Sequence, residues 1–95
     1  MNRELEKFIK VYLDYQEGYD TSGALRATLY AFKAEYVERV RKGLEVVLNE
    51  RELSTGDYER LTDIEFRSDE DLYSYLREMF QYLFEDGEEQ PMPPV

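Results

Sequence analysis

The chain of 95 residues contains no cysteine, no histidine and no tryptophan. Without cysteine there are no disulfides and no thiolate chemistry. Without histidine the commonest general base is missing, and so are imidazole-ligated zinc, copper and haem sites and the Glu-x-x-His pairs of di-iron bundles. The glycines also lack the spacing and the lysine of a phosphate-binding loop. We therefore expect no cofactor and no bound metal.

Long apolar runs are also missing. No stretch approaches the roughly 20 apolar residues that span a bilayer. The first ten residues carry charges instead of the apolar segment of a signal peptide. We therefore expect a cytoplasmic protein that does not bind membranes.

Apolar residues recur at helical spacing along most of the chain, and no segment alternates as a strand would. With 42% hydrophobic and 15% aromatic residues, the chain is too apolar to be disordered despite its charge. The pattern predicts an all-α fold, a small bundle of four to five helices that forms one domain over residues 1–87. Three prolines predict a flexible, disordered C-terminal tail over residues 88–95.

Local signals mark the ends of these helices. Asn2 is placed to cap a first helix over residues 3–15. Ser54 is placed to open a short helix through a capping box, and Ser68 to open the last helix. Gly87 is placed to end that last helix.

The middle of the chain admits two interpretations. Residues 22–50 contain no proline, so one long helix is possible, but the apolar face drifts near residues 33–34, which equally allows a break between two helices. Gly43 lies inside this helical region, where glycine costs up to about 1 kcal/mol relative to alanine. We interpret it as a point of close packing against another helix.

The negative charge lies in one half of the sequence. Residues 1–47 contain eight acidic and eight basic residues, whereas residues 48–95 contain fourteen acidic and four basic residues. The whole net charge of −10 therefore belongs to the C-terminal half. A negative electrostatic field concentrated in one half of the chain repels nucleic acid and attracts basic protein surfaces. We expect a basic protein partner, and no nucleic acid.

Acidic residues are densest between residues 57 and 71, where only Arg60 and Arg67 oppose them. Helix dipoles explain the acids in first turns, but not Glu59, Asp63 and Glu65. Nine tyrosines add side chains that suit cores and interfaces alike, and those outside the main helical stripes are open to both interpretations. The predicted partner-binding site combines acids with two tyrosine anchors: Asp57, Tyr58, Glu59, Asp63, Glu65, Asp69, Glu70, Asp71 and Tyr73.

Short motifs carry a family resemblance over roughly residues 5–84. They are an aromatic first helix, a Gly/Asp turn, a Leu-Glu-rich helix, a Leu-Ser helix start and an aromatic-Leu step: FIKVYL at 8–13, EGYD at 17–20, LEVVL at 44–48, LS at 53–54 and YL at 75–76. In these features the chain resembles the immunity proteins of contact-dependent growth inhibition and related polymorphic toxin systems. The resemblance implies an intracellular inhibitor that binds one toxin domain and has no catalytic activity.

Together, these observations predict that the chain is not an enzyme. They predict a protein that neutralises a cognate toxin domain, expected to be a nuclease, whose arginines and lysines normally grip phosphates. Two alternatives stay open: an acidic nucleic-acid mimic that inhibits a DNA-binding defence enzyme, and a small structural or oligomerising module. A carboxylate enzyme built on Asp14 and Asp20 is least favoured, because nothing marks either residue as buried. The sequence does not determine the oligomeric state.

Overall fold

The computed structural model describes residues 1–95 and contains five α-helices and no strand, which confirms the predicted small all-α bundle. The helices are α1 (Arg3–Tyr12), α2 (Ala24–Tyr30), α3 (Ala34–Glu50), α4 (Thr55–Thr62) and α5 (Asp69–Phe84). None of them combines the length and the apolar composition that a bilayer-crossing helix needs.

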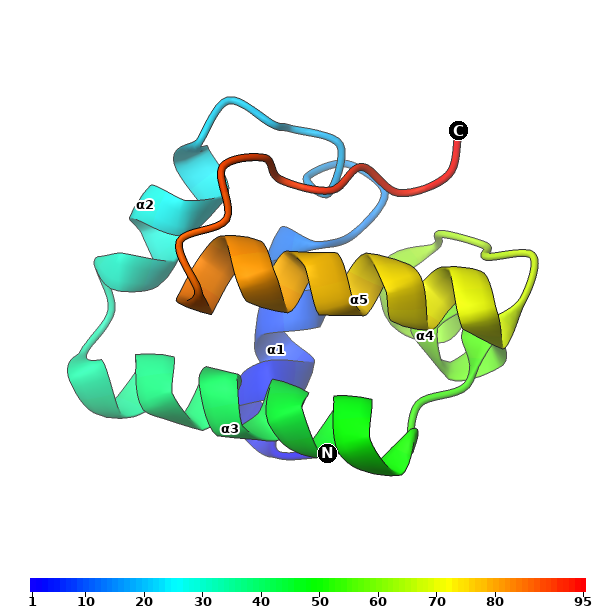
Figure 1. Ribbon diagram of the computed structural model, residues 1–95, viewed down its shortest axis with the longest axis horizontal. Coiled ribbons are helices and arrows are strands. Elements are labelled where there is room, and N and C mark those ends of the chain that lie inside the picture. Colours follow the sequence, from blue (N-terminus) through cyan, green and yellow to red (C-terminus); the bar gives the residue numbers. More distant parts are fainter.

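The two long helices, α3 and α5, contact each other and run in opposite directions (Figure 1). α1 crosses behind them and contacts α3 and α4, while the short α2 contacts α3 at the other end of the molecule. All five helices contribute to one cluster of buried residues, which also includes Leu53, Ile64 and Phe66 from the connecting segments. The α4–α5 end of the molecule is therefore tied to the same core as the rest.

The first helix begins at its predicted cap but is shorter than predicted. Asn2 Oδ1 accepts a hydrogen bond from the Leu5 backbone N–H at 2.7 Å, as expected of a cap. The helix ends at Tyr12 instead of residue 15. The reason is Asp14, whose Oδ1 accepts from the backbone N–H groups of Gln16 and Glu17 at 3.1 and 2.8 Å and so folds a turn in place of another helical turn.

Residues 22–50 form two helices, which settles the alternative that the sequence left open. Lys33 has an extended backbone (φ −61°, ψ 149°) and separates α2 from α3. Beside the break, the Phe32 ring stacks on Tyr36, with ring centroids 4.4 Å apart, and lies edge-on to Tyr12 at 6.2 Å.

The prediction of a disordered tail over residues 88–95 is not supported. After α5 the chain turns back and runs along that helix toward its start (Figure 1). Gln90 Nε2 donates to the Asp20 carbonyl at 3.0 Å, and Pro93 is buried. The sequence argument failed here because proline prevents helix formation but does not prevent an extended segment from packing on a folded surface.

Candidate partner-binding surface

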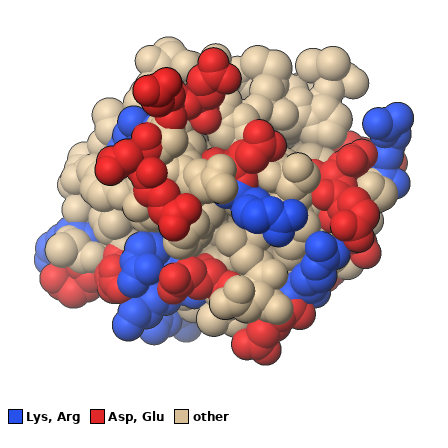
Figure 2. Space-filling view, in the orientation of Figure 1, with Lys and Arg blue, Asp and Glu red and all other residues tan.

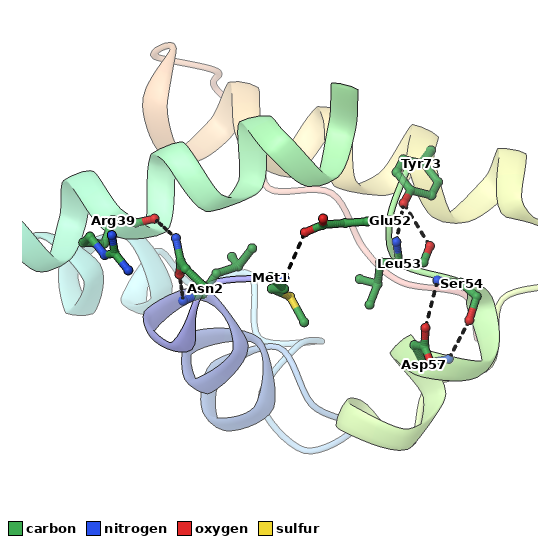
Figure 3. Close-up of polar contacts among 9 residues, drawn as sticks. Met1, Asn2, Arg39, Glu52, Leu53, Ser54, Asp57 and Tyr73 are labelled. Atoms are coloured by element: carbon green, nitrogen blue, oxygen red, sulfur yellow. Dashed lines mark hydrogen bonds and ion pairs between the residues drawn. The ribbon is translucent and has the colours of Figure 1, made fainter. Parts of the chain in front are cut away.

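The predicted acidic site begins at a well-formed helix start. Ser54 Oγ accepts from the Asp57 N–H at 3.0 Å, and the Asp57 carboxylate accepts from the Ser54 N–H at 3.5 Å, which confirms the capping box (Figure 3). Arg60 also donates to Asp57. Hydrogen bonds from Ser54, and then from Arg60, hold the pKa of Asp57 below its usual value. Asp57 is thus fixed in place and already paired.

The segment from 63 to 67 presents its side chains alternately inward and outward. Ile64 and Phe66 are buried, whereas Asp63, Glu65 and Arg67 are exposed. The Phe66 ring lies against two buried tyrosine rings of the core, at centroid distances of 5.5 and 5.2 Å. Because its inward side chains are packed, this connector holds the two carboxylates outward on a supported backbone.

The start of α5 supplies the last three acids of the predicted site. Ser68 Oγ accepts from the Asp71 N–H at 3.1 Å and so caps the helix as predicted. Asp69, Glu70 and Asp71 are exposed in its first turn, where the positive end of the helix dipole favours them. The Glu70 carboxylate lies 3.4 Å from an Arg51 nitrogen, and Asp71 lies 3.7 Å from Arg67.

Ion pairing divides the seven predicted acids into two groups. Asp57, Glu70 and Asp71 have a basic partner within the chain. The other four have none and are exposed; we call them the unpaired acidic surface: Glu59, Asp63, Glu65 and Asp69. In Figure 2, one group of acidic side chains lies toward the right-hand side of the molecule, next to basic side chains at its edge, and another lies toward the upper left; acidic and basic side chains alternate along the lower side.

The two tyrosines predicted as partner anchors are in the core. Tyr58 and Tyr73 are 0% and 1% exposed, so neither is available to a partner in this conformation. The Tyr73 hydroxyl donates to the Leu53 carbonyl at 2.9 Å and accepts from the Leu53 N–H at 3.0 Å (Figure 3). Burial raises the pKa of both phenols, most strongly that of Tyr58. The prediction of exposed anchors is therefore corrected. Tyr73 is covered because α5 is buried over a wider face than its apolar stripe indicated, and Tyr58 on α4 packs against the Phe66 and Tyr75 rings.

The exposed aromatic side chains lie elsewhere, on segments that the site prediction left out. Tyr15 and Tyr30 are 64% and 53% exposed, and Phe32 is also exposed. Tyr15 follows α1, while Tyr30 ends α2 and donates from its hydroxyl to the Leu83 carbonyl at 2.5 Å. For Tyr30, a position outside the helical stripe was the available signal, but that signal did not separate it from buried Tyr73 and Tyr82. Phe32 has the spacing of an inner-face residue, so the sequence pattern did not indicate its exposure.

Two open grooves flank the acidic surface. One, of about 370 Å³, lies between α1 and the start of α4 and includes Asp57 and Arg60 in its lining. The other, of about 400 Å³, lies between the start of α5 and the tail and includes Asp71 and Glu78. No three acidic side chains converge as a cation-binding group would. What this end of the molecule offers chemically is negative charge on a supported surface.

Comparisons with family models, with curated proteins and with solved structures found no match to this chain.

Proposed function

We propose that the chain is an immunity-type inhibitor that binds a basic toxin domain, a nuclease, through the unpaired acidic surface. The observation that carries the proposal is the set of four exposed carboxylates without a basic partner, from Glu59 to Asp69, in the half of the chain that carries the whole net charge of −10. Glu59 lies within α4, Asp63 and Asp69 lie at helix ends, and Glu65 lies on the packed connector. Because their backbone is already ordered, little backbone entropy is lost when a partner binds.

The mechanism follows from the charges. A negative surface accelerates encounter with a basic protein and favours pairing with the lysines and arginines by which a nuclease grips phosphates. Bound there, the inhibitor occupies the surface that the nucleic acid needs. The proposal requires no catalysis and no cofactor from this chain, and it places the chain in the cytoplasm, where such a toxin would act.

The proposal is tested by affinity capture with three tagged proteins, using a lysate of the source cells. One is the wild type, and one carries Glu59→Gln, Asp63→Asn, Glu65→Gln and Asp69→Asn. The matched control carries four substitutions at scattered acids that are also exposed and unpaired: Glu17→Gln, Glu35→Gln, Glu50→Gln and Glu88→Gln. Both variants lose four negative charges from −10, so only the position of the charges distinguishes them.

We expect the wild type and the control to retain one basic protein that the surface variant loses. Expressed alone in a bacterial host, that protein should arrest growth and degrade nucleic acid, and co-expression of this chain should restore growth. Its association rate should fall steeply as salt rises. Equal capture by both variants would refute the site. A mixture of unrelated DNA-binding proteins in place of one partner would favour nucleic-acid mimicry.

A further inference from the structure

The tail is attached to the body at both of its ends. At its start, the Arg26 guanidinium donates to the Gly87 carbonyl and to the Tyr82 carbonyl, and lies over the Tyr82 ring 3.9 Å from its centroid. Near its end, the Tyr19 hydroxyl donates to the Pro94 carbonyl. The tail therefore follows a defined path between α5 and the loop of residues 14–22 (Figure 1).

One contact along this path, from the Tyr19 hydroxyl to the Pro94 carbonyl, is of the kind by which proteins recognise proline-rich peptides. Prolines restrict the backbone to an extended conformation and have no N–H, so the carbonyls are left as acceptors for side-chain donors. Here the Tyr19 hydroxyl donates a hydrogen bond to the Pro94 carbonyl, and Pro93 is buried. In PPII recognition, aromatic-lined grooves bind such segments in the same way, and the low entropy of the peptide favours binding.

The tail does not fill the surface on which it lies. A groove of about 400 Å³ remains open on its α5 side, with Pro91, Met92 and Pro94 on one wall and the buried Phe66 and Tyr75 among the other lining residues. The tail therefore forms one wall of an open groove, although Pro93 itself is buried.

We propose that the surface beneath residues 90–94 is a binding site for an extended, proline-containing peptide segment of another protein, and that the chain's own tail occupies it in cis. An incoming segment has to displace the tail, which is present at an effective concentration on the order of millimolar. External binding is therefore weakened for as long as the tail is docked. This inference is independent of the basic partner proposed above.

The test uses the full-length chain and a synthetic peptide with the sequence of residues 88–95. Nuclear magnetic resonance titration compares wild type, Pro93→Ala, and Pro93→Ala combined with Tyr19→Phe. A second peptide has alanine at the position of Pro93. Because Pro93→Ala loosens the tail, we expect that chain to bind the proline peptide at least about tenfold more tightly than wild type does. We expect the alanine peptide to bind the Pro93→Ala chain more weakly than the proline peptide does. We also expect the proline peptide to bind the chain with both substitutions more weakly than it binds Pro93→Ala.

Equal affinity of the proline peptide for wild type and Pro93→Ala, or equal affinity of the two peptides, would overturn the proposal. A wild-type dimer that the peptide dissociates would also overturn it, in favour of tails exchanged between two copies. If Pro93→Ala does not fold, the proposal is tested instead by backbone relaxation of the Met92 amide in the wild-type chain, with and without excess peptide. The proposal is supported if the Met92 amide is as ordered as the amides in the helices and becomes mobile when excess peptide displaces the tail. It is overturned if the amide is as mobile as that of a free peptide.

Discussion

At the scale of single residues, the tyrosines differ in what their hydroxyls contact. Tyr73 is buried with two hydrogen bonds to the backbone of Leu53. Tyr58 and Tyr75 are also buried, and their hydroxyls lie near each other without a hydrogen bond of normal geometry to any group. A buried polar group without a partner costs free energy, whereas a partnered group holds its neighbours in place. Tyrosines of equal burial therefore contribute differently to stability.

This difference predicts opposite outcomes for the same substitution. Tyr73→Phe leaves the Leu53 N–H and carbonyl without that partner, and we expect it to lower the free energy of unfolding by about 2 kcal/mol. Tyr58→Phe removes an unpartnered hydroxyl, so it should be neutral or stabilising. Urea unfolding with an unchanged m-value measures both effects. A Tyr58→Phe loss as large as that of Tyr73→Phe would contradict this assignment of hydrogen bonds.

At the scale of elements, caps set where the helices begin. The Ser54 capping box lies at the start of α4, the helix that carries Glu59 of the proposed binding surface. We expect Ser54→Ala to destabilise the protein by about 1 kcal/mol, because the Asp57 N–H loses its acceptor. Ser74, exposed on α5, provides the control, and Ser74→Ala should not destabilise. Thermal unfolding followed by circular dichroism measures the pair, and equal midpoints would contradict the role of the cap.

Packing between helices reverses the usual effect of a helical glycine. At Gly43 in α3, an added Cβ would lie 2.5 Å from Asn2 Nδ2 and 3.1 Å from Leu5 Cβ. Asn2 has little freedom to move, since it caps α1 and donates from Nδ2 to the Arg39 carbonyl at 2.7 Å (Figure 3). This contact confirms the interpretation of Gly43 as a point of close approach.

We expect Gly43→Ala to destabilise the protein by about 1–2 kcal/mol, because overpacking outweighs the gain in helix propensity. Gly56→Ala in α4 is the matched control, since its Cβ would meet no atom closer than 3.9 Å, and it should be neutral or stabilising. Denaturant midpoints of both variants test the expectation. Stabilisation by Gly43→Ala would show that α1 and α3 separate at little cost.

At the scale of the whole molecule, buried phenols limit stability at alkaline pH. Burial raises the pKa of Tyr36, Tyr58, Tyr73 and Tyr75 above the usual value of 10.0. The folded state therefore holds these protons at a pH where the unfolded chain releases them. Their contribution is complete below pH 10 and is lost as the pH rises above it, by up to about 1.4 kcal/mol per pH unit for each fully buried phenol.

We therefore expect the unfolding midpoint to fall as the pH is raised above about 10. The double variant Tyr58→Phe, Tyr75→Phe should show a shallower decline, because two of the phenols that titrate on unfolding are gone. Urea titrations at a series of alkaline pH values measure the slope. Identical slopes for wild type and the double variant would show that these hydroxyls titrate in the folded state.

The acidic part of the candidate site was predictable and its aromatic part was not. Asp69 is exposed in the first turn of α5, as charge and capping indicate, and Asp63 and Glu65 also lie at the surface, at the end of α4 and on the connector. Whether a tyrosine outside the stripe is exposed depends on what covers it. For Tyr73 the covering segment includes Leu53, which lies 20 residues earlier in the chain.

By itself, the sequence determined the helical class, the caps at Asn2, Ser54 and Ser68, and the acidic half, because periodicity, capping and charge act over a few residues. Only the tertiary structure decided that Tyr58 and Tyr73 are buried, and that the tail lies on α5. These outcomes depend on contacts between segments far apart in sequence, such as Gln90 with Asp20. Local patterns carry no information about which distant surface a side chain will meet.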